Sequence, residues 1–463
     1  MDQRTDELGH GNIAKLLFTY ALPAIIATTA SSLYNVIDRI FIGQGVGAIA
    51  LAGLGLTLPI MNLATALGTL VGAGSAALVS IRIGEGRRKD ATQILCNALI
   101  LNIIISLAFS VIALTFLDPI LTVFGADAET LPYAKSFLQI ILLGNVFTHI
   151  LFGLNSIMRA SGYPVKAMLS VLITVVCNII LAPIFIFALK WGIQGAATAT
   201  VISQFIGMSW VLAHFLSEKS YIHFEKTEMR LEWKLIGDVF AIGLSPFFIH
   251  ICASLVTVIM NWRLKEYGGN LAIATFGIIG SIQALVVTFI LGLTHGMQPI
   301  VGFNYGAKQY DRAVKTFRLT VWCATAACAV GFVSVMAVPG MITRAFTNDP
   351  TVMALTVPAM RHCCSMMLIT GFQVVTSNFF QSIDKAKISI FLSLSRQIIF
   401  LIPFIAVLPL AFGLEGAWCA MPAADLLASV VTAVILLRFF RKMGWNKSKK
   451  NRTFALAFKK GKI

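Results

Sequence analysis

The chain has 463 residues, of which 57% are hydrophobic and only 12% charged, and its mean hydropathy is +0.84. A typical soluble domain carries roughly 25% charged residues, so a water-soluble fold of this size is excluded. The net charge of +16 does not indicate nucleic-acid binding, because the basic residues fall mostly in short loops and the tail, as membrane topology requires.

Twelve apolar runs are long enough to cross a bilayer, which takes roughly 20 residues each. Lipid offers no hydrogen bonds to an open strand edge, so these runs are predicted to be helices. The polar segment 1–12 precedes the first run, whose length favours a retained helix over a signal peptide. The twelve runs begin near residues 13, 50, 92, 134, 166, 194, 235, 271, 314, 352, 387 and 416.

Lysine and arginine are unevenly distributed between the predicted loops. The connections after the second, fourth, sixth, eighth and tenth runs hold about 16 basic residues, and the alternate connections hold about 5. The richer set is expected in the cytoplasm, together with both termini. The segment from Arg441 to Ile463 has nine Lys or Arg and no acid, which agrees with a cytoplasmic tail, either solvated or touching anionic lipid.

The two halves of the chain repeat each other at a nearly constant offset of about 222 residues, over six predicted helices. An even number of spans per half makes the repeats parallel, with a pseudo-two-fold axis along the membrane normal. The prediction is an all-α membrane protein of two six-helix bundles. The matching pairs are Pro23 and Pro246, Gly74 and Gly296, Gly84 and Gly306, Ala91 and Ala313, Asn155 and Asn378, and Gly195-Ala196 and Gly416-Ala417.

This pattern divides the chain into five predicted parts. They are a cytoplasmic N-terminus (1–12), an N-lobe with helices 1–6 (13–216), a cytoplasmic linker (217–234), a C-lobe with helices 7–12 (235–440) and a basic cytoplasmic tail (441–463).

Few charges lie within the predicted spans, where a charge costs at least about 2.5–3.5 kcal/mol and is usually functional or paired. Asp38 lies in the first run, and a lone carboxylate in a cavity can take up and release a proton; a salt bridge is the alternative. The neighbouring Arg39 is a poor partner, because adjacent helix residues point about 100° apart. Arg396 and Asp425 are predicted to pair and hold helices 11 and 12 together, with a substrate or coupling role left open.

Other polar groups suggest no catalytic or metal chemistry. His149, His214, His250 and His295 lie in or near spans, where a histidine either relays protons or packs with hydrogen bonds. The eight cysteines show no metal-ligand spacing and are expected to be small buried hydrophobic residues. No G-x-x-x-x-G-K-[ST] loop occurs, so ATP does not drive this chain. Energy must come from an ion gradient, or transport is passive.

Four long segments carry a family resemblance. They are "SSLYNVIDRIFIGQGVGAIALAGLGLTLPI" from Ser31, "GIQGAATATVISQ" from Gly192, "GMQPIVGFNYGAKQYDRA" from Gly296 and "SNFFQSIDKAKISIFLSLSRQIIFLIP" from Ser377. Over residues 12–442 the chain resembles the multidrug and toxic compound extrusion (MATE) family, in its MepA-like branch. The resemblance implies a V-shaped pair of six-helix lobes and export of organic, often cationic, compounds against H⁺ or Na⁺ influx.

The resemblance also implies a coupling site in the N-lobe, to which Asp38, Asn178 and Thr200 correspond. The family's second acid, four residues after the Asn, is replaced here by Ala182. Helix 7 lacks the acid of an alternative C-lobe cation site. Further candidates for a structural or substrate role are Arg396, Asp425, His295, Gln298 and Asn261.

The predicted function is therefore secondary-active export of amphipathic, cationic molecules by alternating access, in a monomer with no cofactor beyond H⁺ or Na⁺. A bacterial inner membrane is the expected location. A flippase for lipid-linked precursors is an alternative, although twelve spans argue against it. A membrane-embedded enzyme would need a paired catalytic constellation, which the sequence lacks, and a channel fits two homologous halves less well.

Overall fold

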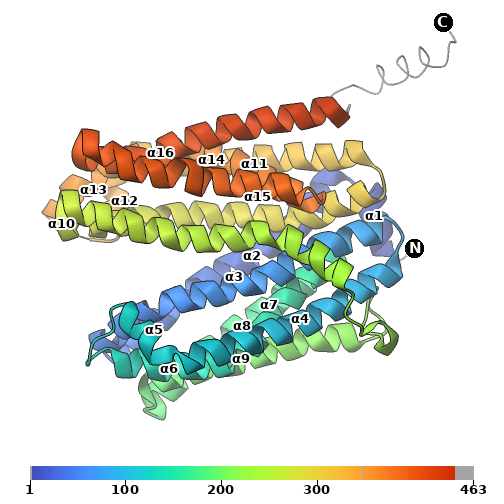
Figure 1. Ribbon diagram of the computed structural model, residues 1–463, viewed down its shortest axis with the longest axis horizontal. Helices are drawn as coiled ribbons and strands as arrows, with labels where there is room; N and C mark the ends of the chain where they lie inside the picture. The colour runs from blue at the N-terminus through green and yellow to red at the C-terminus, as the bar shows by residue number, and fades with distance from the viewer. Residues whose placement is uncertain (1–2, 348, 444–463) are drawn as a thin grey trace, which may run out of the picture.

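The computed structural model describes residues 3–347 and 349–443, and every regular element within these ranges is helical (Figure 1). Of the predicted basic tail, residues 444–463 lie outside the described part. The elements of the first half are α1 (Gln3–His10), α2 (Ile13–Gly45), α3 (Ala48–Gly84), α4 (Arg88–Thr115), α5 (Leu117–Val123), α6 (Leu131–Leu143), α7 (Asn145–Ala160), α8 (Pro164–Pro183), the π-helix η1 (Ile184–Ala188), α9 (Gly192–Leu216) and the 3₁₀ turn η2 (Lys226–Glu228).

The second half is built of fewer but longer elements. They are α10 (Trp233–Gly306), α11 (Tyr310–Ala337), α12 (Pro339–Arg344), α13 (Pro350–Cys363), α14 (Met367–Ser382), α15 (Ala386–Leu394), the π-helix η3 (Ser395–Leu401) and α16 (Ile402–Met443).

Two of the long helices each contain two spans. A straight helix of 74 residues, the length of α10, would be about 110 Å long, several times the thickness of a bilayer core. The backbone leaves the helical region at Gly269 (φ 65°, ψ −162°) in α10 and at Gly413 (φ 58°, ψ −138°) in α16. These positive φ angles suit glycine, which has no Cβ. Each helix therefore folds back at its glycine.

The described part of the chain then contains twelve spans, as the sequence predicts. Eight helical stretches are long and apolar enough to cross a membrane, and two further spans are the bent pairs α6–α7 (54°) and α13–α14 (51°). The breaks in α10 and α16 add one span each. The apolar runs of the sequence begin within a few residues of these spans, because Pro and Gly punctuate the chain at the same points.

The two halves also turn at corresponding points. Gly47 (φ 115°) and Gly269 (φ 65°) both stand between the first and second spans of their half, and they are separated by the repeat offset. Gly192 and Gly413 (both φ 58°) stand before the last span and are related in the same way. The repeat detected in the sequence is therefore present in the backbone, down to its turns.

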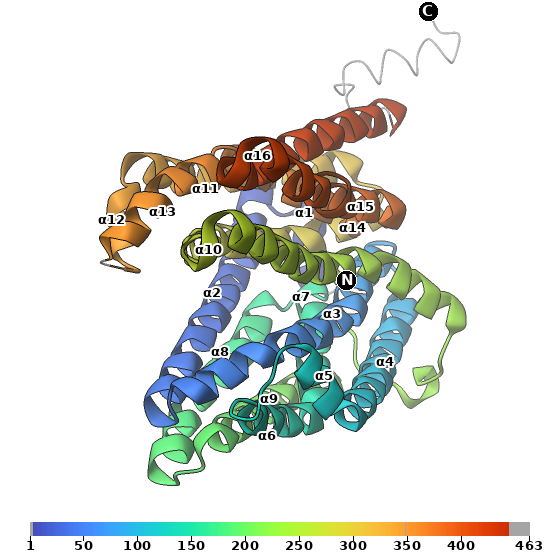
Figure 2. The same ribbon diagram turned by 60° about the vertical axis from the view of Figure 1, so that its left-hand side comes forward.

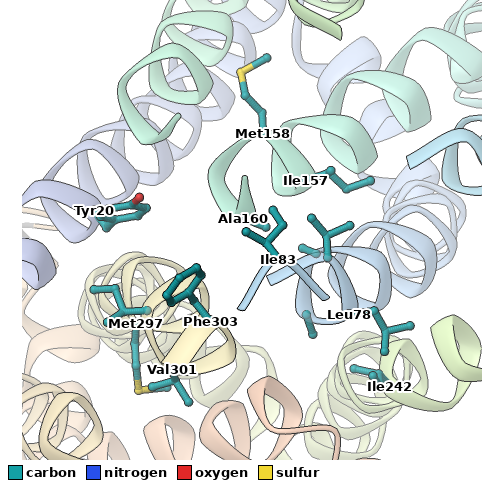
Figure 3. Close-up of a cluster of buried hydrophobic side chains, with 14 of the residues drawn as sticks. Tyr20, Leu78, Ile83, Ile157, Met158, Ala160, Ile242, Met297, Val301 and Phe303 are labelled. Atoms are coloured by element: carbon teal, nitrogen blue, oxygen red, sulfur yellow. The ribbon is translucent and has the colours of Figure 1, made fainter. Parts of the chain in front are cut away.

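The two bundles pack against each other at one end of the molecule only. That end carries α1 and the last residues of α16, whereas α5 and α12 lie at the other end (Figures 1 and 2). We name the first the closed end and the second the open end. The largest hydrophobic cluster combines both halves, for example Leu78 and Ile157 with Met297 and Phe303 (Figure 3). The remaining clusters each draw on one half alone.

Close contact at the closed end depends on glycines of α3 and α10. A Cβ on Gly84 would stand 2.0 Å from the carbonyl oxygen of Phe303, and a Cβ on Gly306 would stand 2.1 Å from that of Ile81. Gly84 and Gly306 are equivalent positions of the repeat, and so are Ile81 and Phe303. The two contacts are therefore images of one another about the pseudo-two-fold axis, which passes between α3 and the second span of α10.

The N-terminal helix α1 docks on the opposite half of the molecule. Arg312 donates a hydrogen bond to the carbonyl oxygen of Gly11 (2.7 Å) and another to that of Leu8 (3.3 Å), and Asn304 also donates to Leu8 (3.1 Å). Leu8 is buried in the cluster that both halves share. Thus α1 links the first half to the second at the closed end.

Candidate functional site

Three helices of the first half bring a polar group together inside an apolar bundle. Asn178 of α8 donates a hydrogen bond to the hydroxyl oxygen of Thr200 of α9 (3.0 Å), and the Tyr34 hydroxyl of α2 lies 3.1 Å from the same oxygen. Thr200 donates its own hydrogen to the carbonyl of Ala196 (3.1 Å). A hydroxyl has one hydrogen and two lone pairs, so Tyr34 must donate to Thr200, whose bonding capacity is then full.

Asp38 lies one helical turn after Tyr34, on the same face of α2. Its residue is 8% exposed, and its Oδ1 atom is buried without a hydrogen-bond partner in the described part of the chain. The neighbouring Arg39 is exposed, and none of the ion pairs among the described residues includes Asp38. A buried polar atom without a partner is unusual, and it marks Asp38 as a position where a proton or a cation can bind.

The structure therefore relates all three residues of the predicted coupling site. Asn178 and Thr200 are in direct contact, and Asp38 is connected to them through Tyr34. Tyr34 was not among the residues selected from the sequence, although its spacing of four residues from Asp38 was a usable signal.

An apolar layer covers the polar group on the side of the open end. It consists of Ile42, Ala182 and Ala196, each fully buried in one hydrophobic cluster. These residues lie one turn from Asp38, Asn178 and Thr200 along their helices, which aligns the two layers. Ala182, where the resembling family has an acid, thus belongs to the apolar layer and offers no ligand atom.

The second half contains a different charged group. Arg396 of η3 donates from its Nε to Oδ1 of Asp425 of α16 at 2.5 Å, and Thr370 of α14 donates to the other carboxylate oxygen at 3.4 Å. The predicted contact between Arg396 and Asp425 is present, and it ties η3 to α16. Both residues line a cavity of the second half.

The other predicted candidates lie apart from these two groups. Gln298 of α10 donates to the carbonyl of Ala73 of α3 (3.4 Å), which links the two halves. His295, one turn earlier, has a buried Nδ1 without a hydrogen-bond partner in the described part. Asn261 is half-buried in the first span of α10. Of the four histidines, His149 is 2% exposed and both its ring nitrogens lack partners among the described residues.

No group of three His, Cys, Asp or Glu side chains within residues 3–347 and 349–443 is arranged to hold a metal ion. The cysteines carry no disulfide, and most are buried, although Cys419 is exposed. The chemistry available to the described residues is therefore proton or cation binding by carboxylates.

Comparison with known proteins extends over nearly the whole chain. The MatE family model matches twice, at residues 23–184 and 246–407, so the two matches are separated by the offset of the sequence repeat. The Multidrug export protein MepA of Staphylococcus haemolyticus is 25% identical over 435 residues, which cover 94% of this chain and 96% of that protein.

Solved structures agree in fold. A structure of the MATE multidrug transporter DinF-BH in complex with rhodamine 6G is 37% identical, with a TM-score of 0.88 over 95% of this chain and 99% of that one. An outward-facing multidrug resistance MATE family transporter of the MOP superfamily is 22% identical, with a TM-score of 0.90 over 96% and 100% of the two chains. With two matches to one family model and this common fold, the chain belongs to the MATE family of multidrug transporters.

Proposed function

We propose that this chain is a proton-driven exporter of amphipathic organic molecules, organic cations among them, and that Asp38 carries the proton. The observation that supports this most is the buried, unpaired carboxylate of Asp38 beside Tyr34, Asn178 and Thr200. A carboxylate without a fixed cation can be neutral in one step of a cycle and charged in another. The MepA relative is named a multidrug export protein, and the DinF-BH structure holds rhodamine 6G.

The proposed cycle is alternating access between the two lobes, 13–216 and 235–440. In the described conformation the lobes share a hydrophobic core at the closed end only. We place the closed end in the cytoplasm, because the basic loops lie there, so this conformation faces outward. Proton binding from outside and release inside would then accompany the rocking of the lobes.

The side-chain oxygens favour a proton over sodium. A hard cation needs several oxygen ligands and compensating charge. The Thr200 oxygen already takes part in three hydrogen bonds, and Ala182 supplies no carboxylate. Asp38 and the carbonyl oxygen of Asn178 would remain, which is too few for Na⁺. One carboxylate suffices for a proton.

The experiment that tests this proposal uses purified protein in proteoliposomes loaded with rhodamine 6G. A pH gradient alone should drive dye movement, and a sodium gradient alone, with the pH gradient collapsed, should not. Asp38→Asn keeps the shape of the side chain but removes the titratable charge, so it should abolish gradient-driven movement while the protein still reaches the membrane.

Asp118→Asn is the matched control, because Asp118 is an exposed acid of the same half that pairs with Lys135 at 2.7 Å. It should transport as the unchanged protein does. Sodium-driven transport, or near-normal efflux by Asp38→Asn, would refute the proposed coupling.

Cysteine labelling tests the orientation. Thr227 is exposed at the closed end and Ala128 at the open end. In a cysteine-free background, an impermeant reagent applied to intact cells should label Ala128→Cys and leave Thr227→Cys unlabelled. The reverse pattern would overturn the placement of the closed end in the cytoplasm.

A further inference from the structure

The second half contains a cavity with one charged wall and one apolar wall. Four elements, α10, α14, η3 and α16, contribute most of its lining, together with the end of α13. The lining residues are Gln283, Val286, Val287, Ile290, Cys363, Met367, Thr370, Arg396 and Asp425. Its polar groups face aliphatic side chains, an arrangement that suits an organic molecule with one ionised group.

The bonding of the ion pair in this cavity is unequal. Both oxygens of Asp425 accept hydrogen bonds, one from Arg396 and one from Thr370. Arg396 uses only its Nε, and in the described part its two terminal nitrogens donate no hydrogen bond. Its side chain is 24% exposed, against 7% for Asp425. A purely structural pair would use the guanidinium fully, whereas here its outer edge faces the cavity.

The backbone places this arginine by an uncommon local structure. Arg396 lies in the π-helix η3, Ser395–Leu401, which interrupts the span between α15 and α16. Pro403 follows it and cannot donate a backbone hydrogen bond. Single π-turns within α-helices are rare and occur frequently at functional sites. The widened turn therefore sets Arg396 apart from an ordinary packing residue.

We propose that this cavity binds the carboxylate of a zwitterionic or anionic amphipathic substrate, with Arg396 as the anchor. The terminal nitrogens of a guanidinium match the two oxygens of a carboxylate. The Gln283 amide can add a donor, and Val286 and Met367 contact the apolar part of the molecule. This inference rests on the proposed export function and extends its substrates beyond cations.

A matched pair of dyes tests it. Rhodamine 6G is a cationic ethyl ester, and rhodamine 19 is the corresponding free acid, with the same ring system and an ionised carboxylate. The dissociation constants of both dyes for the purified full chain are measured by fluorescence polarisation. Binding is read without any gradient, so a failure of proton-driven export and a failure of this inference are separate results.

Two variants separate carboxylate binding from a structural ion pair. Asp425→Asn frees the guanidinium from its competitor and should improve rhodamine 19 binding relative to rhodamine 6G. The double variant Arg396→Gln/Asp425→Asn removes both charges and leaves no unpaired acid. It should lower the affinity for rhodamine 19 relative to rhodamine 6G about tenfold, the effect of losing a charge-assisted hydrogen bond.

The outcomes are distinct. A relative gain in Asp425→Asn and a relative loss in the double variant would support the inference. If both variants weaken the two dyes equally, the pair is structural and the inference is overturned. It is also overturned if the unchanged protein does not bind rhodamine 19, or if the ratio of the two affinities is the same in all three proteins. Should the double variant fail to fold, the Asp425→Asn ratio alone decides.

Discussion

Replacing Gly84 with alanine should open the closed end of the molecule. The added Cβ would stand 2.0 Å from the carbonyl oxygen of Phe303, where ordinary contact begins at 3.4 Å. The obstacle is backbone, so no rotamer change can relieve it, and α3 and α10 must separate. Overpacking of this kind typically costs about 1–3 kcal/mol. The overlap exists only while the two halves are packed together, so the alanine penalises this conformation alone.

An energy of this size changes the ratio of two conformations by about 5- to 150-fold. Spin labels at the exposed positions Lys89 and Lys315, one in each half near the closed end, report the separation by pulsed electron resonance. Gly84→Ala should shift the distance distribution toward longer distances and slow rhodamine 6G export. Gly237→Ala is the control, because a Cβ at that exposed helical position meets nothing within 4 Å. Identical distributions for Gly84→Ala and Gly237→Ala would refute the reasoning.

Three further predictions concern the site and the closed end. Ala182→Asp buries an unpaired carboxylate in the apolar layer; the melting temperature in detergent should fall, and Na⁺ should restore part of the loss. A melt that ignores Na⁺ would contradict this. Burial and the nearby Asp238 raise the pKa of Asp384, so ionisation destabilises the fold as pH rises. Asp384→Asn should therefore raise the melting temperature at pH 8, and the gain should vanish below about pH 4, where the unfolded carboxyl is also protonated. Arg312→Gln removes two hydrogen bonds to α1, so amide exchange in residues 3–11 should accelerate about tenfold, whereas unchanged exchange would show that apolar contacts alone hold α1.

The spans could be predicted from sequence because the bilayer leaves few alternatives. Every backbone group in lipid must be bonded internally, so a long apolar run is a helix. The repeat offset also predicted equivalent turns, such as that at Gly269. It did not predict that Lys308 and Asp384 adopt positive φ angles (59° and 56°), where Gly86 and Gly162 stand at the equivalent positions of the first half. Tertiary contacts impose these angles on side chains that rarely adopt them.

The site was predicted in part. Asp38 was prominent because acids are rare in spans, and Asn178 and Thr200 followed from the family resemblance. Tyr34 was missed because a tyrosine in an apolar run is equally consistent with packing. The pair of Arg396 and Asp425 was expected from charge alone, but the cavity and the π-helix depend on side-chain packing that periodicity does not encode. The closed and open ends could not be predicted at all, because one sequence must be compatible with every conformation of its cycle.

The two halves share a backbone but differ in where their charges stand, and this difference bears on mechanism. At the offset between the two family matches, Asn261 takes the place of Asp38. The first half thus keeps an unpaired carboxylate, while the second keeps a carboxylate that Arg396 neutralises. The symmetric backbone gives both lobes equivalent contacts for rocking, such as those of Gly84 and Gly306. Under the proposed mechanism, the asymmetric charges confine proton binding to one lobe and leave the other free to select the substrate.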